Sequence, residues 1–274
     1  MKAVQGALAV EGKRVSLVRL CTWLGVARRT FYYSPRPRHL PLDECKVTHV
    51  WEAIKAHPTY GYRRIAVVLG ENRKVVRRIL QRKGWQVRKR PQGHRPRAQG
   101  LPSVAARPNQ RWATDLTMVW CGRDRWCHLA LVIDCGSREL LGWRLSARGH
   151  ARTAEAALEE ALVGRFGYLG RVPGELSLRS DNGLVFTSRR YTATVRAYGI
   201  TQEFTTPYTP EQNGLIERFI RSLKEECIWQ QRFESLAHAQ RAIRWIRYYN
   251  TQRPHQALGY RSPAAVGSEA SIAA

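Results

Sequence analysis

Acidic residues are scarce in this sequence: its 274 residues include 21 Asp and Glu against 46 Lys and Arg, a formal net charge of +25. No apolar run reaches the roughly 18 residues that a membrane span needs, and the N-terminal segment is too weakly apolar for a signal peptide. We therefore expect a cytoplasmic protein with no membrane partner. The excess of positive charge favours an anionic polymer such as DNA as the substrate.

Paired cysteines are lacking as well. The chain has six cysteines and no CxxC pair. In an intracellular protein this pattern predicts reduced, mostly buried thiols, and it argues against disulfides or a zinc site.

The positive charge is concentrated in the first part of the chain. Residues 1–110 hold 24 Lys and Arg and 5 Asp and Glu, a net charge of +19, whereas residues 111–274 have a net charge of +6. Because the basic residues fall on helical patterns, we interpret this part as DNA-binding and not as a low-complexity basic tail.

The N-terminal segment, residues 1–38, predicts a helix-turn-helix. Helices are expected over 14–24 and 27–32, separated by Gly25, and the second one carries Arg28 and Arg29. The proline-rich stretch 34–38 reads as a linker.

A second helical DNA-binding domain is predicted over 39–85. Asp43 and Asn72 are placed to cap its first and third helices, and Gly84 to end the third. The third helix has an apolar side and a strongly basic side, which suits groove or backbone contact. The predicted DNA-binding residues here are Arg63, Arg64, Arg73, Lys74, Arg77, Arg78, Arg82 and Lys83.

Residues 86–110 predict a basic linker. The stretch has four prolines and few large apolar side chains, and it contributes Arg88, Lys89 and Arg90 as further expected DNA contacts.

From residue 111 the pattern changes to that of an α/β fold. Three strands in succession are followed by alternating helices and strands, which predicts a five-stranded mixed sheet with helices. The expected strands cover 112–120, 126–134, 140–145, 176–179 and 200–204, and the expected helices cover 153–166 and 188–198. Another helix is expected over 235–249. Residues 264–274 read as a frayed tail.

Three carboxylates stand out in this region. Asp115 lies in the apolar run RWATDLTMVW, and Asp181 follows a short strand and opens an Asp-Asn-Gly turn. If the two strands are neighbours, these carboxylates approach one point. Glu217 lies on an amphipathic helix after a long loop, roughly 100° from its apolar stripe, with Arg221 and Lys224 on the same side. A surface pair between Glu217 and Arg221 is the simpler alternative.

Such a trio can hold two divalent metal ions. Carboxylate oxygens suit Mg²⁺ (or Mn²⁺), and two ions about 4 Å apart can activate the attacking oxygen and stabilise the leaving oxygen at phosphorus. Water as the attacking group cuts a strand, and a 3′-OH joins two strands.

Several motifs resemble known sequences. The Asp-Asn-Gly turn at 181–183, the segment PEQNGLIER at 210–218 and the 35 residues between Asp181 and Glu217 resemble DDE transposases of the retroviral-integrase-like superfamily. HPTYGYRRI at 57–65, the Asn-Gly-x-x-Glu-Arg motif at 213–218 and YYNTQRPHQALGYRSP at 248–263 are similar to the second-frame protein (OrfB) of the IS3 family of bacterial insertion sequences. Together they span nearly the whole chain.

The resemblance implies an RNase H-like integrase catalytic core over 111–263. It implies Asp115, Asp181 and Glu217 as catalytic and metal-binding residues, with Lys224 near the DNA end. It also implies binding of terminal inverted repeats and target DNA, strand cleavage and strand transfer, homo-oligomers on DNA, and a nucleoid-associated location. An upstream-frame helix-turn-helix protein is the expected frameshift partner, since this chain has no heptad zipper of its own.

Two other functions compete with this one. The chain could be a catalytically inactive integrase-like DNA-binding regulator, or a hydrolase that acts on sugars through paired acids. The complete trio and Lys224 favour the transposase over the regulator. The basic N-terminal part argues against the sugar hydrolase.

Overall fold

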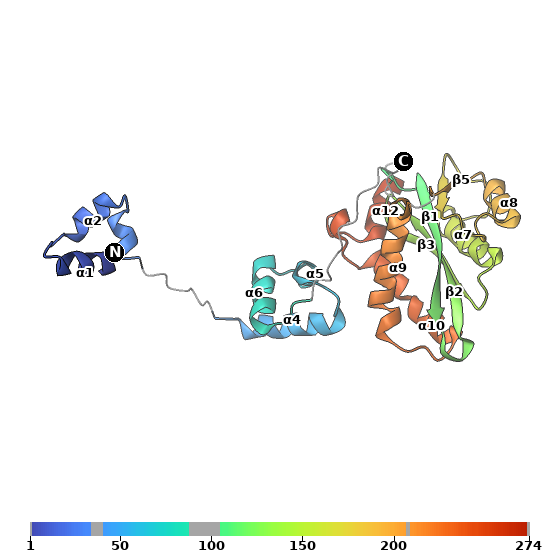
Figure 1. Ribbon diagram of the computed structural model, residues 1–274. Coiled ribbons are helices and arrows are strands. Elements are labelled where there is room, and N and C mark those ends of the chain that lie inside the picture. The colour runs from blue at the N-terminus through green and yellow to red at the C-terminus, as the bar shows by residue number, and fades with distance from the viewer. Residues whose placement is uncertain (1, 34–40, 88–104, 207–208, 273–274) are drawn as a thin grey trace. The chain divides into compact units, whose positions relative to one another are not determined.

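The computed structural model describes residues 2–33, 41–87, 105–206 and 209–272 (Figure 1). The chain divides into two compact units, residues 1–43 and 44–274. No helix within the described ranges is long and apolar enough to cross a membrane.

The first unit is helical. It contains α1 (Lys2–Val10), α2 (Leu17–Trp23) and α3 (Arg28–Phe31). The side chain of Ser16 caps α2 by accepting a hydrogen bond from the Arg19 backbone N–H at 3.3 Å. Gly25 has a φ of +61° in the turn between α2 and α3, where a residue with a side chain would be strained. The turn therefore forms where the sequence predicts it, whereas α1 is not predicted.

The second unit begins with three helices, α4 (Glu44–Ala56), α5 (Tyr62–Val68) and α6 (Arg73–Lys83). The third of these helices begins after Asn72 and ends at Gly84, as predicted. The Asn72 side chain accepts from the Lys74 backbone N–H at 2.8 Å, and Gly84 ends α6 in the left-handed conformation. The buried face of α6 consists of Val76, Ile79 and Leu80, so its basic residues lie on the other sides of the helix.

A five-stranded sheet forms the centre of the rest of the unit (Figure 1). Its strands are β1 (Arg111–Trp120), β2 (Trp126–Asp134), β3 (Leu140–Ser146), β4 (Ser177–Ser180) and β5 (Thr201–Phe204), in the order β3-β2-β1-β4-β5. The first three strands pair antiparallel. β4 pairs parallel with β1, and β5 pairs parallel with β4. The predicted mixed sheet is confirmed, and β1 and β4 are indeed neighbours.

Helices cover both faces of the sheet. One face packs against α7 (Ala151–Phe166) and α8 (Arg189–Ala197), in a core that includes Trp112, Ala130 and Val132. Gly142 of β3 allows α7 to approach, because a Cβ there would lie 2.1 Å from the Ala157 carbonyl oxygen.

The opposite face packs against α9 (Gly214–Glu226), α10 (Leu236–Ile243) and α11 (Trp245–Thr251). Alternate residues of the central strands, Ala113, Leu129 and Leu131, belong to this core. The strand alternation therefore decides which of the two helical layers each side chain meets.

Three details differ from the sequence predictions. The helix expected over 235–249 is broken at Arg244 into α10 and α11. The expected frayed tail contains α12 (Pro263–Ile272), which packs on α11. Trp120 and Trp126, which lie in the predicted strands, are nevertheless 48% and 54% exposed; they flank the turn of the β1–β2 hairpin and pack edge-to-face on each other. All six cysteines are free thiols and only Cys45 is exposed, as predicted.

Candidate active site

Asp115 lies in the middle of the central strand β1. It is on the same side of the strand as Ala113 and Val119, both of which belong to the core covered by α9. Its Oδ1 accepts a hydrogen bond from the Leu116 backbone N–H at 2.7 Å. The side chain is half-buried. Strand alternation thus directs this carboxylate toward the layer that carries Glu217.

Asp181 follows the last residue of β4, the parallel neighbour of β1. Its Oδ1 accepts from the Gly183 backbone N–H at 3.0 Å, which closes the predicted Asp-Asn-Gly turn. A Cβ on Gly183 would lie 2.9 Å from this oxygen, so the turn leaves little room for a side chain there. Asn182 ties the turn to the strand end through a 2.8 Å bond from its side chain to the Thr205 carbonyl oxygen.

Glu217 lies in the first turn of α9. The buried residues of this helix are Leu215, Ile216, Phe219, Ile220 and Leu223, and Glu217 is exposed beside them. Lys224 is half-buried seven residues later. Arg221 forms its ion pair with Glu225, at 3.0 Å. The simpler alternative, in which Arg221 pairs with Glu217, is therefore not the pairing that the structure contains.

The charges of these groups meet at Asp115. Burial raises the pKa of Asp115 to about 7, and the Leu116 hydrogen bond opposes that rise. The negative charges of Asp181 and Glu217 raise this pKa further, whereas the positive charge of Lys224 lowers it. The charges of Asp181, Glu217 and Lys224 therefore all affect the ionisation of Asp115, although the three acids come from three separate elements.

The donor chemistry of this set fits a hard divalent cation. All three acids offer carboxylate oxygens, and the raised pKa of Asp115 marks a carboxylate that a nearby positive ion would stabilise in its charged form. Among the described residues, no three His, Cys, Asp or Glu side chains stand close enough together to hold an ion. Asp181 and Glu217 are exposed, so packing against other side chains does not fix the positions of their carboxylates.

A buried polar network holds the loop that leads to Glu217. Arg179 of β4 is 1% exposed; its Nε donates to Glu203 Oε2 at 3.0 Å and its Nη1 donates to the Gln212 carbonyl oxygen at 2.8 Å. The Gln212 side chain in turn accepts from the Thr206 backbone N–H at 2.8 Å. Sequence reasoning missed these positioning residues, because their partners are far apart in the chain. The polar pair Gln212-Asn213 before an amphipathic helix is the signal that could have indicated them.

A second network fixes the other end of α9. Arg253 donates to Glu226 through Nη2 at 2.6 Å and Nε at 2.8 Å, and the Nη1 of Arg64 lies 3.5 Å from the same carboxylate. The hydroxyls of Tyr60 and Tyr248 are 2.8 Å apart. The motifs at 57–65 and 248–263 therefore contact each other, and both contact α9.

The predicted DNA-binding residues have differing surroundings. Most are exposed on the described helices, namely Arg28, Arg29, Arg63, Arg73, Lys74, Arg77, Arg82, Lys83 and Arg221. Arg64 and Arg78 are half-buried, and Arg64 stacks over the Tyr60 ring at 5.0 Å. Arg88, Lys89 and Arg90 lie outside the described residues.

Comparison with known proteins identifies the fold and the family of the chain. Two models described as integrase core domain match residues 105–210 and 198–263. The chain of a simian T-cell lymphotropic virus intasome structure, solved in complex with PP2A regulatory subunit B56 gamma, superposes with a TM-score of 0.50 at 18% identity, over 80% of this chain and 74% of that one. The sheet order and this superposition define an RNase H-like integrase-type fold.

Relatives with similar sequences come from bacterial insertion elements. The 39.2 kDa protein of insertion element IS476 from Xanthomonas euvesicatoria is 30% identical over 262 residues, which cover 93% of this chain and 73% of that protein. Transposase InsD of insertion element IS2 from Escherichia coli is 28% identical over 278 residues, covering 94% and 92%. The chain belongs to this family of insertion-element DDE transposases, consistent with its resemblance to IS3 second-frame proteins.

Proposed function

We propose that the chain is a Mg²⁺-dependent DNA transposase that binds the terminal inverted repeats of its element and carries out strand cleavage and strand transfer. The observation that carries the proposal is the convergence at Asp115, where the charges of Asp181, Glu217 and Lys224 all act on one half-buried carboxylate. A carboxylate whose pKa is shifted by burial and by several specific charged groups is typical of a functional site.

Asp115, Asp181 and Glu217 would hold two Mg²⁺ (or Mn²⁺) ions. Such ions supply an activated attacking oxygen and neutralise negative charge on the phosphate. The residues of the chain supply the rest. Asp115 provides a fixed ligand on the rigid central strand, while Lys224 offsets part of the acidic charge and attracts the DNA phosphate.

DNA binding is assigned to the basic N-terminal parts. The helix-turn-helix segment 1–38 and the helical domain 39–85 would bind the repeat, and the linker 86–110 would follow the DNA backbone. The catalytic core would cover 111–263, followed by a terminal segment at 264–274. Residues such as Arg73, Arg77 and Arg82 lie on the exposed sides of α6, where phosphates can reach them. Two element ends must be brought together, so we infer a homo-oligomer on DNA. An upstream-frame protein would act as partner.

The test is cleavage of a labelled duplex that carries one terminal repeat, in Mg²⁺ and in EDTA. The wild type should nick the duplex only with metal, and Asp181→Asn should bind it equally well but nick it at least 100-fold more slowly. A competing function, the catalytically inactive DNA-binding regulator, predicts tight binding with no metal-dependent nicking by either protein. That second result would refute the enzyme proposal.

A further inference from the structure

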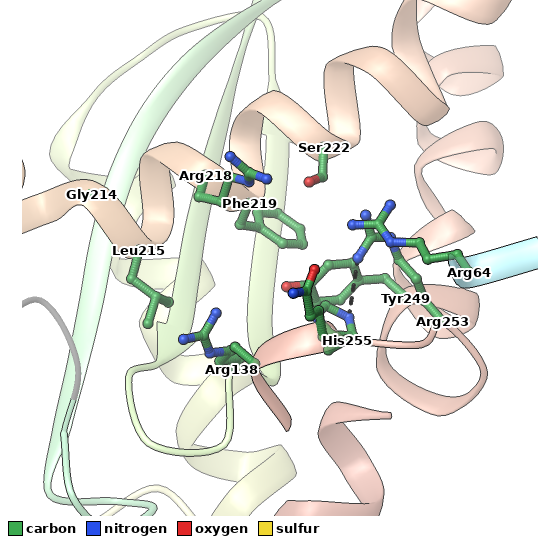
Figure 2. Close-up of a pocket in the computed structure, with 12 residues that line it drawn as sticks. Arg64, Arg138, Gly214, Leu215, Arg218, Phe219, Ser222, Tyr249, Arg253 and His255 are labelled. Atoms are coloured by element: carbon green, nitrogen blue, oxygen red, sulfur yellow. Dashed lines mark hydrogen bonds between the residues drawn. The ribbon is translucent and has the colours of Figure 1, made fainter. Parts of the chain in front are cut away.

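A cationic cavity lies beside α9 (Figure 2). Its volume is about 480 Å³. Its walls come from α5, α9 and α11, from the turn between β2 and β3, and from the segment after α11. Four arginines line it, Arg64, Arg138, Arg218 and Arg253, and no acidic residue is among the lining side chains.

Two of the four arginines share one carboxylate within the protein. Arg253 is 3% exposed and makes the two-bonded ion pair with Glu226, and Arg64 shares that carboxylate. This one carboxylate serves two guanidiniums, so the cluster keeps an excess of positive charge.

The other two arginines have no partner in the described part of the chain. Neither the Arg138 side chain nor the Arg218 side chain makes a hydrogen bond or an ion pair there, and both line the cavity. Arg218 is exposed and Arg138 half-buried. Figure 2 shows both guanidinium groups at the cavity, Arg218 on α9 and Arg138 on the β2–β3 turn. Planar guanidinium groups with unused donors suit the oxygens of a phosphate.

A buried histidine, His255, also lines the cavity. His255 is 7% exposed, and its Nε2 lies 3.4 Å from Arg253 Nη1. Burial, followed by the charges of Arg253, Arg64 and Arg138, lowers the pKa of His255 to about 3. The ring is therefore neutral at physiological pH, mainly because it is buried, and the neighbouring arginines add to this effect. Buried Phe219 and Tyr249, packed edge-to-face at 4.7 Å, form an apolar wall that weakens solvent screening.

We propose that this cavity binds a backbone phosphate of the DNA strand, through Arg138 and Arg218. The proposal rests on the proposed function and deepens it. Arg218 directly follows Glu217 on α9, with its side chain about 100° further around the helix, so a phosphate held there would fix the strand within one helical turn of the candidate catalytic acid. The cavity would thus set where the strand lies when it is cut.

The first experiment measures DNA affinity as a function of salt. The proteins are the wild type, the double variant Arg138→Gln/Arg218→Gln, and the control Arg196→Gln, which removes one exposed arginine from α8. One phosphate contact accounts for a slope of about 0.9 in log affinity against log salt. The double variant should lose about one unit of slope and about tenfold in affinity at 150 mM salt. The control should change affinity less than twofold.

Equal slopes for the double variant and the control would overturn the proposal. Among the described residues, the side chains of Arg138 and Arg218 have no hydrogen-bond or ion-pair partner, so the double variant should fold normally, and thermal unfolding checks this. Arg218→Lys keeps the charge but loses the planar fork, and should recover only part of the affinity. Metal-dependent nicking separates the two proposals. If the wild type nicks the duplex and the double variant keeps the wild-type slope, only the cavity assignment fails. If the double variant shows the predicted loss of slope but the wild type never nicks the duplex, the proposed function fails.

A second arm distinguishes a strand phosphate from free phosphate. Inorganic phosphate at constant ionic strength is added to the protein–DNA complex and to the protein alone. For a strand site, millimolar phosphate should stabilise the wild type only slightly and displace little DNA. Strong stabilisation by phosphate that Arg138→Gln/Arg218→Gln abolishes, with no effect on DNA affinity, would identify a free-phosphate site and contradict the proposal.

Discussion

Arg253 and Glu226 form a two-bonded ion pair, at 2.6 and 2.8 Å, that anchors the C-terminal end of the helix carrying Glu217. Both side chains are nearly buried, at 3% and 9% exposure. The pair also joins two motifs that lie almost 200 residues apart, since Arg64 contacts the same carboxylate. The position of α9 on the sheet, and with it the place of Glu217, therefore depends on contacts at some distance from the candidate active site.

Removing this anchor should destabilise the protein strongly. Glu226→Gln leaves the buried Arg253 charge without its partner, and we expect a loss of about 3 kcal/mol in the free energy of unfolding, measured by urea denaturation. Glu225→Gln is the matched control one residue earlier, where the pair with Arg221 is exposed, and it should cost less than about 0.5 kcal/mol. Similar losses in the two variants would show that the buried pair is not an anchor.

His255 should make the protein sensitive to acid. Its pKa is about 3 in the folded protein and 6.5 in the unfolded chain. Below pH 6.5 the imidazole therefore becomes protonated in the unfolded chain but stays neutral in the folded protein. Stability is therefore fully present above pH 6.5 and falls with pH, by about 2 kcal/mol at pH 5.

The variant His255→Gln should remove this part of the pH dependence. Denaturation at pH 7 and pH 5 gives the comparison, with exposed His49→Gln as the control. The same pH dependence in His255→Gln and the wild type would mean that another group is responsible.

Asp115 should show the opposite dependence when metal is withheld. The pKa of this carboxyl is about 7 in the folded protein against 3.8 unfolded, so the folded protein keeps the proton longer and loses stability as pH rises toward 7. Relative to Asp115→Asn in EDTA, the wild type should lose about 3 kcal/mol between pH 4 and pH 7.

Added Mn²⁺ should reverse that loss at pH 8 in the wild type alone, because the ion replaces the proton. Thermal unfolding with EDTA and with Mn²⁺ provides the measurement. Equal effects of Mn²⁺ on wild type and Asp115→Asn would remove Asp115 from the metal site.

Much of the fold follows from local sequence pattern. The apolar runs in 111–120 and 129–133 locate the central strands, and the caps at Asn72 and Gly84 locate α6. These signals are read from neighbouring residues, so they need no knowledge of the rest of the chain.

The errors arise where tertiary contacts decide. α12 forms because it packs on α11, although its own sequence has no strong helical pattern. Trp120 and Trp126 are exposed at the turn of the β1–β2 hairpin although both side chains are large and apolar, which no count of apolar residues predicts.

The candidate site divides in the same way. Asp115, Asp181 and Glu217 could be selected from spacing and from their strand or helix positions. The groups that hold them in place could not: Arg179 meets Glu203 and Gln212, and Glu226 meets Arg253 and Arg64, only after the chain has folded.

The central claim is that Asp181 binds the catalytic metal together with Asp115 and Glu217. The most direct test is the metal preference of Asp181→Cys in the cleavage of a terminal-repeat duplex. A thiolate is a poor ligand for Mg²⁺ and a better one for Mn²⁺. We therefore predict that cleavage is lost in Mg²⁺ and largely recovered in Mn²⁺, while the exposed control Glu175→Cys is active in both. Full activity of Asp181→Cys in Mg²⁺, or an equal loss with both metals, would contradict the account.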